Sequence, residues 1–241
     1  MLFVNTVAIL CNIIQLIGDA VTLAIFDLDG TLLSGDSDYN WGQFLVEKGL
    51  VDTKLYKEAN DRFFEQYQAG ALDIYEYLAF SLKPLTQFSK AERDALHQEF
   101  MDVKVRPMMQ EEASKLLKFH KDQGHFLLLI TATNQFVTGP IADSLGMDHI
   151  IAPVPEVIDD QYTGNVVGIP SFQEGKVTRL NDWLKETGHS MEGSYFYSDS
   201  RNDLPLLELV EHPIAVDADP TLTEIAKERG WPHISLRGNS L

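Results

Sequence analysis

Two aspartates separated by one residue, Asp27 and Asp29, are the strongest candidates for chemistry in this sequence. They follow an apolar run, 21–26, and precede Gly30 and Thr31. Of two carboxylates placed in this way, one can attack phosphorus as a nucleophile while the other donates and later accepts a proton. A glycine lets the backbone turn closely around a phosphate. A solvated turn or a calcium site is the alternative reading, but the position at the end of a buried strand favours catalysis.

Two further positions could bind the oxygens of a phosphate. Thr131 ends a second apolar run and offers its hydroxyl, with the backbone of Ala132 beside it, although a threonine here could equally cap the next helix. Lys176 stands at the start of a predicted helix, where a cation is slightly unfavourable. A lysine that faces a transferring phosphate would explain this placement.

A second pair of carboxylates, Asp199 and Asp203, follows a third apolar run and lies beside Asn202. Mg²⁺ prefers six oxygen ligands, and two or three carboxylates with a backbone carbonyl can supply several of them. We therefore predict a Mg²⁺ site that involves Asp27, Asp29 and Asp199. The alternative for the second pair is a helix N-cap and an acid that favours the helix dipole.

The elements that must position these residues alternate along the chain. Short apolar runs with β-branched residues predict buried parallel strands, and stretches of helical period precede the second and third of them. This alternation predicts an α/β fold with a doubly wound parallel sheet. Ligands of such sheets bind beyond the carboxyl ends of the strands, where the candidate residues fall. The predicted strands are 21–26, 125–130, 194–198 and 213–216.

Residues 35–105 differ, because they contain several helical patterns and no convincing strand. We expect this segment to form a helical cap domain over the site, where it could exclude water and select the substrate. Residues 21–34 and 106–241 would form the core domain, and residues 151–170 a short hairpin within it. Residues 1–20 would be an apolar N-terminal extension.

Composition limits the classes of partner. The formal net charge of −17 repels a nucleic-acid backbone, so we expect no nucleic-acid partner. A single cysteine excludes an internal disulfide framework and fits the cytoplasm. The extension 1–20 has no Lys or Arg and is interrupted by polar residues, which argues against a secretory signal and a membrane span. A docked or frayed amphipathic extension is expected, and a membrane anchor stays open as the alternative.

The motifs, in their order and context, resemble those of the haloacid dehalogenase superfamily over essentially the whole chain from Thr22 onward. The resemblance implies that Asp27 is the nucleophile and Asp29 the acid/base, with the main-chain oxygen of Asp29 also reaching the metal. It implies that Asp199 completes the Mg²⁺ site. Dehalogenases proper lack the second aspartate, so Asp29 favours a phosphatase.

The same resemblance implies that Thr131 and Lys176 bind phosphate and that Asp203 orients Lys176 or a metal-bound water. A helical insertion between the first and second motifs is similar to the phosphoserine phosphatase subfamily, whose members hydrolyse phosphoserine, histidinol phosphate or other amino-alcohol phosphates. The chain departs from phosphoserine phosphatase at Gly30, where that enzyme commonly has Ser, and at 200–203, where a Gly-rich loop is usual.

Asp36 occupies about the place where the phosphoserine enzyme presents a glutamate to the ammonium of its substrate. Arg62 and Arg93 are the only arginines in residues 35–105, and neither stands in a context that marks it as the partner of a substrate carboxylate. An amine without a carboxylate, as in histidinol phosphate, is therefore the preferred substrate. Four aromatic residues could stack on an imidazole or pack as core: Trp41, Phe44, Tyr67 and Tyr75.

Three functions remain open at this point. The preferred one is hydrolysis of a small-molecule phosphate monoester. The second is a phosphotransferase that passes the aspartyl-phosphate to another alcohol. The third is a non-catalytic phosphate-binding module, because a fold does not by itself imply a function.

Overall fold

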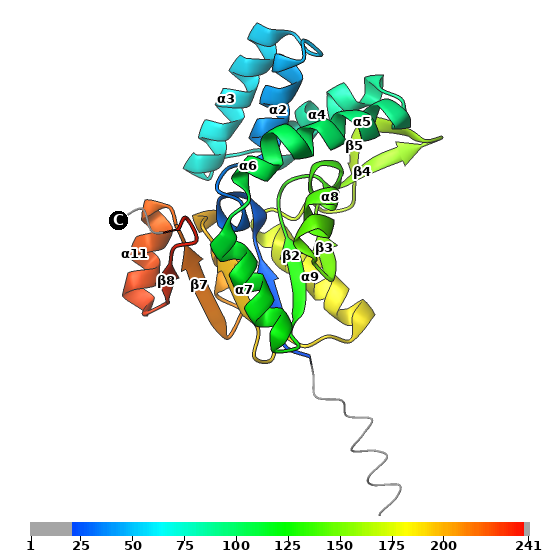
Figure 1. The fold of residues 1–241 in the computed structure, drawn as a ribbon. Helices are drawn as coiled ribbons and strands as arrows, with labels where there is room; N and C mark the ends of the chain where they lie inside the picture. Colours follow the sequence, from blue (N-terminus) through cyan, green and yellow to red (C-terminus); the bar gives the residue numbers. More distant parts are fainter. Residues whose placement is uncertain (1–20, 239–241) are drawn as a thin grey trace, which may run out of the picture.

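The computed structural model describes residues 21–238 and is built around a six-stranded parallel sheet (Figure 1). Helices separate the strands along the chain, which confirms the predicted doubly wound α/β class. The order across the sheet is β3-β2-β1-β6-β7-β8. The strands are β1 (Leu23–Phe26), β2 (Phe126–Ile130), β3 (His149–Ile151), β6 (Tyr195–Ser198), β7 (His212–Val216) and β8 (His233–Ile234).

Four of the helices between β1 and β2 form a separate layer above the carboxyl edge of the sheet (Figure 1). Each begins at a residue whose side chain accepts from a backbone N–H in the first turn: Asp36, Asp52, Asp73 and Ser89. The helices are α2 (Ser37–Glu47), α3 (Thr53–Ala69), α4 (Ile74–Leu82) and α5 (Lys90–Phe100). We call these residues, 37–100, the helical insertion.

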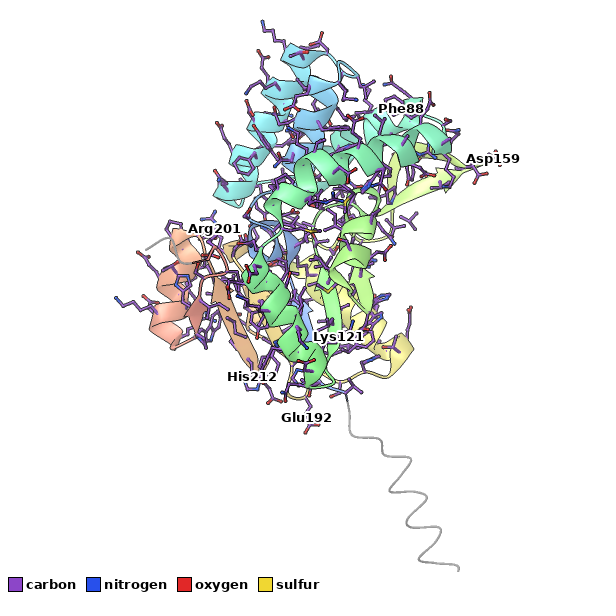
Figure 2. All side chains as sticks on the ribbon, in the orientation of Figure 1. Phe88, Lys121, Asp159, Glu192, Arg201 and His212 are labelled. Carbon is purple, nitrogen blue, oxygen red and sulfur yellow. The ribbon has the colours of Figure 1, made fainter. Side chains whose placement is uncertain are left out.

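An antiparallel hairpin, β4 (Val154–Ile158) and β5 (Gln161–Val167), packs against the helical insertion. Its tip at Asp159 projects away from the parallel sheet (Figure 2). Arg93 of α5 holds the hairpin: it donates to the carbonyl of Asp160 at 3.0 Å and lies over the ring of Tyr162. The insertion is thus fixed to the core by a segment that follows it by some 60 residues in sequence.

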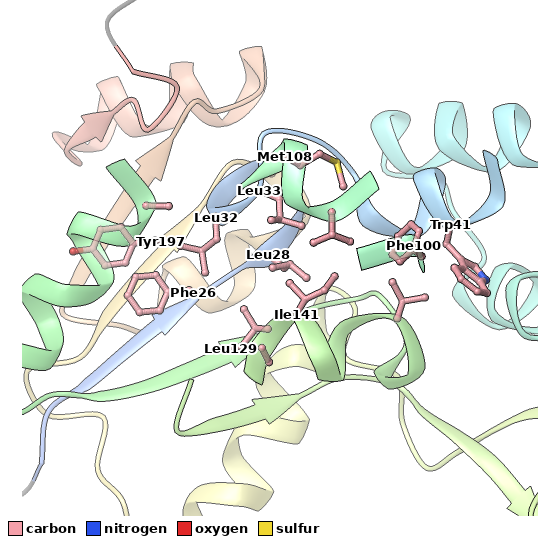
Figure 3. Packing of buried hydrophobic residues seen from close by; sticks show 14 of the residues in the cluster. Phe26, Leu28, Leu32, Leu33, Trp41, Phe100, Met108, Leu129, Ile141 and Tyr197 are labelled. Atoms are coloured by element: carbon pink, nitrogen blue, oxygen red, sulfur yellow. The ribbon is translucent and has the colours of Figure 1, made fainter. Parts of the chain in front are cut away.

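The core has two layers, one on each face of the sheet. Ala24 and Phe26 belong to one buried cluster, and Leu23 and Ile25 to the other, because successive strand side chains point to opposite faces. Burial on both faces explains why the strands appear in the sequence as continuous apolar runs. Figure 3 shows part of the first cluster, which includes Phe26 and Leu129. Helices α7 (Glu111–Asp122) and α8 (Gln135–Leu145) contribute to the first cluster, and α9 (Glu174–Thr187), α10 (Leu204–Leu207) and α11 (Pro220–Arg229) to the second.

The predicted extension at residues 1–20 lies outside the described residues. Within 21–238, none of the helices combines the length and the apolar character that crossing a bilayer requires.

Two neighbouring histidines, His120 and His125, pack against the tyrosine rings of β6. His120 is fully buried, its Nε2 is 2.8 Å from the hydroxyl of Tyr197, and its Nδ1 is 2.8 Å from Nδ1 of His125. Burial, and then the neighbouring His125, lower the pKa of His120 to about 4. His120 is therefore neutral in the folded protein at pH 7.

We expect acid to destabilise the protein through His120. The unfolded chain binds a proton at about pH 6.5 and the folded one only near pH 4, so the free energy of unfolding falls as the pH drops through this interval. The loss amounts to at most about 3 kcal/mol. Urea denaturation of wild type and His120→Gln between pH 4 and pH 7 measures it. The free energy of unfolding should depend less on pH in His120→Gln than in wild type. In the exposed His233→Gln it should depend on pH as in wild type. Equal slopes in all three proteins would contradict the expectation.

Candidate active site

Asp27 is the first residue after β1 and lies at the carboxyl edge of the sheet. Its N–H donates to the carbonyl of Tyr197 on β6 at 2.9 Å, which extends the pairing of the two strands by one residue. The side chain is only 4% exposed. Burial raises the pKa of Asp27 to about 7, although Lys176 lowers it.

The loop after Asp27 brings Asp199 against it. Gly30 has a φ of 75°, and a Cβ at this position would lie 2.0 Å from Oδ2 of Asp199, so the turn and the close approach both require glycine. Thr31 fixes the contact, because its hydroxyl donates to Oδ1 of Asp199 at 3.2 Å and accepts from the Asp199 N–H at 3.0 Å. The first and last predicted motifs therefore meet here.

Lys176, in the first turn of α9, joins Asp27 to Asp203. Its Nζ donates to Oδ1 of Asp27 at 2.8 Å and lies 2.7 and 2.8 Å from the two oxygens of Asp203. The lysine is 3% exposed. Burial alone would lower its pKa, but Asp203 and Asp27 raise it above the usual range, so the group is charged. Gly175 permits the close packing of this turn, because a Cβ there would lie 2.0 Å from the carbonyl of Pro170.

Asp203 is anchored from the strand side as well. The Ser198 hydroxyl, at the end of β6, donates to Oδ2 of Asp203 at 2.7 Å. The adjacent Asn202 accepts from Gln173 at 3.1 Å and donates to the carbonyl of Tyr67 in the helical insertion at 3.2 Å. Both predicted supporting residues therefore lie beside the site, and Asn202 links the core to the insertion.

Asp29 points away from this ion pair and toward the helical insertion. Its Oδ1 accepts from the N–H of Ser37, the first residue of α2, at 2.6 Å, and its Oδ2 accepts from the hydroxyl of Thr133 at 2.8 Å. Burial, followed by the neighbouring Asp36, raises the pKa of Asp29 to about 7. A carboxyl group with such a pKa can both donate and accept a proton at neutral pH.

Thr131 directly follows β2, and its own N–H donates to the carbonyl of Ile151 at 3.0 Å. Its hydroxyl oxygen accepts from the N–H of Thr133 at 3.1 Å, which leaves the O–H free to donate into the cavity that Thr131 and Ala132 line. The carbonyl of Thr131 accepts from the buried hydroxyl of Ser171 at 2.6 Å. Hydrogen bonds with Ile151 and Ser171 therefore fix the start of this loop.

A cavity lies between the sheet edge and the helical insertion. Asp27 and Asp29 form its floor with the 131–133 loop, and Asp36 belongs to its wall. One oxygen of Asp36 accepts from the Tyr39 N–H at 2.8 Å as the N-cap of α2. Among the described residues, neither Lys nor Arg belongs to this lining. Five aromatic rings also line the wall, with Asn60, Leu72 and Ile74 between them: Tyr39, Phe63, Phe64, Tyr67 and Tyr77.

Of the four aromatic residues considered from the sequence, Tyr67 lines the cavity. Trp41 and Phe44 belong instead to the hydrophobic core, where Trp41 packs edge-on against Phe100. Tyr75 is 57% exposed. A helical pattern alone does not distinguish a ring that faces a cavity from one that faces the core.

The two arginines of the insertion lie elsewhere. Arg62 pairs with Glu76 on the surface at 3.0 Å, and Arg93 holds the hairpin. A further arginine, Arg201, lines a neighbouring cavity that shares Asp29 and Asp36 with the first, but its guanidinium donates to the carbonyl of Ala69 at the end of α3.

The charge of the site suits a bound cation. Burial, and then Asp27, raises the pKa of Asp199 well above its usual range, since a single lysine compensates several buried carboxylates. No group of three or more His, Cys, Asp or Glu side chains within residues 21–238 could hold a metal ion by itself. Asp27 and Asp199 would therefore need additional oxygens, such as a main-chain carbonyl and water, which is the ligand set that Mg²⁺ accepts.

Sequence reasoning missed four groups that hold the candidate carboxylates. Thr31, Thr133 and Ser198 act through hydroxyls, and their positions one to four residues from a predicted site residue were the available signal. Ser37 acts through its main-chain N–H, which any residue type except proline could supply, so the sequence holds no signal for it.

Comparison with protein families identifies a match between residues 24–208 and the haloacid dehalogenase-like hydrolase model. A histidinol-phosphatase of Neisseria meningitidis is 45% identical over 219 residues, which cover 89% of this chain and 99% of that protein. A phosphoserine phosphatase of Mycobacterium tuberculosis is 29% identical and covers 88% of this chain and 70% of that protein.

Solved structures show the same relationship. A protein of unknown function from Bordetella pertussis superposes with a TM-score of 0.85 at 45% identity, covering 90% of this chain and 99% of its own. A substrate-bound phosphoserine phosphatase superposes with a TM-score of 0.67 at 20% identity, covering 91% and 95% of the two chains. This second likeness concerns the fold alone.

Proposed function

The chain belongs to the haloacid dehalogenase-like hydrolase family and is a phosphatase of small-molecule phosphate monoesters, and we propose that it acts through phosphorylated Asp27 on an amino-alcohol phosphate, with histidinol phosphate the best candidate. One observation carries the mechanism: Asp27, which is paired with Lys176, lines a cavity whose other acids are Asp29 and Asp36. The cavity thus presents a nucleophile that contacts a cation, and a separate acid/base.

In the first step an oxygen of Asp27 bonds to phosphorus as the bond from phosphorus to the ester oxygen breaks. The proton of Asp29 moves to that oxygen, and its pKa of about 7 keeps the proton available at neutral pH. In the second step water attacks phosphorus, its proton returns to Asp29, and the Asp27 carboxylate is released. Lys176 fixes the plane of the nucleophilic carboxylate throughout.

The phosphate would be held by Lys176, by the hydroxyl of Thr131 and by the backbone at Gly30 and Ala132. We propose that the side chains of Asp27 and Asp199 bind Mg²⁺ together with the main-chain oxygen of Asp29. Bound there, the ion supplies positive charge to the phosphate oxygens and to the developing transition state.

The wall of the cavity supports the choice of substrate. It presents an acid, Asp36, and several aromatic rings, and it has neither Lys nor Arg among the described residues. A protonated amine or an imidazole would find a favourable charge and ring faces there, whereas a substrate carboxylate would be left unpaired. Histidinol phosphate carries an amine and an imidazole but no carboxylate. Phosphoserine and other amino-alcohol phosphates are the alternatives.

Phosphate release from a panel of esters tests the proposal. The panel contains histidinol phosphate, phosphoserine, phosphoethanolamine, glycerol phosphate and sugar phosphates, each with Mg²⁺ and with EDTA. We expect hydrolysis that depends on Mg²⁺ and prefers an amine-bearing ester. An added acceptor alcohol that captures the phosphate would instead indicate a phosphotransferase, and a preference for sugar phosphates would contradict the substrate assignment.

The variant Asp36→Asn, assayed with the same panel, tests whether Asp36 recognises the amine of the substrate. Asparagine still caps α2 but carries no charge, so kcat/KM for the preferred amine-bearing ester should fall about 30-fold relative to glycerol phosphate. The matched control is Asp52→Asn, which changes the N-cap of α3 instead. If Asp36→Asn lowers the rates for both esters equally, Asp36 does not recognise the amine.

A further inference from the structure

The carboxylate of Asp29 is bound at both oxygens by groups from two separate parts of the fold. The N–H of Ser37 belongs to the helical insertion, and the hydroxyl of Thr133 belongs to the loop after β2, 104 residues away in sequence. At 2.6 and 2.8 Å, both contacts are short enough for charge-assisted hydrogen bonds. The direction of this carboxylate is therefore set jointly by the first residue of the insertion and by a loop of the core.

Thr133 is well placed to fix this direction. It is 7% exposed and lines the cavity, and its N–H donates to the hydroxyl oxygen of Thr131 at 3.1 Å. The side chain is β-branched, so few rotamers are available to it. Its hydroxyl thus connects the loop that would hold the phosphate to the group that would transfer the proton.

We propose that Thr133 is a positioning residue that aims the Asp29 carboxyl at the ester oxygen and stabilises the carboxylate left after proton transfer. This inference rests on the proposed function, since that function assigns the acid/base role to Asp29. Thr133 donates its hydrogen bond, and such a bond is stronger to a carboxylate than to a carboxylic acid. The hydrogen bond therefore gains strength as the proton leaves Asp29.

The effect of losing the Thr133 hydrogen bond on the rate depends on the leaving group of the ester. When an alkyl ester is cleaved, the bond between Asp27 and phosphorus forms, the bond to the ester oxygen breaks, and that oxygen takes the proton of Asp29. When p-nitrophenyl phosphate is cleaved, the phenolate carries the negative charge itself and needs no proton. If Asp29 is wrongly oriented, cleavage of the alkyl ester should therefore be slower, and cleavage of p-nitrophenyl phosphate should change little.

The experiment compares Thr133→Val, which keeps the shape but removes the hydroxyl, with Thr133→Ser, which retains it. The rate of phosphoenzyme formation is measured by rapid quench with p-nitrophenyl phosphate and with the alkyl ester that wild type cleaves fastest. Thr133→Val should slow formation about 10- to 100-fold with the alkyl ester and less than about 3-fold with the aryl ester. Thr133→Ser should remain within about 3-fold of wild type for both esters.

The matched control is Thr138→Val, which also removes a buried threonine hydroxyl from the segment after β2. That hydroxyl donates to the carbonyl of Asn134 within α8 and has no contact with Asp29. It should leave the ratio of the two rates unchanged. Thermal unfolding checks that the variants fold, and Thr133→Ala replaces Thr133→Val if the valine is not accommodated.

An equal loss with both esters, or no loss with either, overturns the inference. Neither result touches the proposed function, which fails instead if Asp27→Asn still forms a phosphoenzyme. The two failures are therefore distinguishable in the same set of rapid-quench measurements.

Discussion

Asp27→Asn is expected to lower phosphate release at least about 10⁴-fold and to abolish the phosphoenzyme. The amide is a poor nucleophile, and no other carboxylate of the described site both contacts Lys176 and lines the cavity. The fold should survive, because asparagine has nearly the same volume and its carbonyl oxygen can still accept from Lys176. Phosphate release, phosphoenzyme trapping by rapid quench, and circular dichroism measure the three effects.

Two variants give this result its meaning. Asp29→Asn retains the nucleophile, so any phosphoenzyme that forms should persist, because no base activates the water that would hydrolyse it. Asp38→Asn removes another buried carboxylate, one that accepts from Ser81 at 3.1 Å, and should still form a phosphoenzyme. Wild-type activity in Asp27→Asn would refute the mechanism, and a phosphoenzyme in that variant would place the nucleophile elsewhere.

The sheet could be predicted because its central strands are buried on both faces. Leu23–Phe26 and Phe126–Ile130 each appear as an apolar run that ends in a polar cluster, and they pair in parallel as expected. The edge strands β3 and β8 escaped prediction, because three and two residues are too few to show a pattern. The alternation of strands and helical stretches gave the fold class, and the family resemblance supported the phosphatase activity; both are confirmed.

The positions of the candidate site residues could be predicted wherever such a residue directly follows a strand or begins a helix. Asp27, Thr131 and Asp199 are brought together by topology alone, since parallel strands share one carboxyl edge. The residues that hold them could not be predicted, because a hydroxyl such as that of Thr133 finds its partner only after the chain has folded. Arg93 shows the same limit, since its partner is a hairpin that follows much later in the sequence.

Lys176→Met should reduce both stability and activity. The lysine is the cation of two ion pairs, with Asp27 and Asp203, whose side chains are all at most 5% exposed. Removing one partner of a buried ion pair leaves uncompensated charge and costs about 3 to 5 kcal/mol in the free energy of unfolding. Phosphate release should fall about 10²- to 10³-fold or more, because a donor to the transferring phosphate is lost as well.

A double variant separates these two roles of the lysine. Asp203→Asn should destabilise wild type, where it removes one ion pair, but should stabilise Lys176→Met, where it removes a buried charge without a partner. Activity should not return, since Asp27 still lacks its cation. Urea denaturation and phosphate release of the four proteins in this cycle give both quantities. The matched control is Lys185→Met, which breaks an exposed pair with Asp182 on the same helix and should change either quantity little. If the effects of the single changes on stability simply add, the buried pair does not couple these residues, and Lys176 stabilises the site through packing rather than charge.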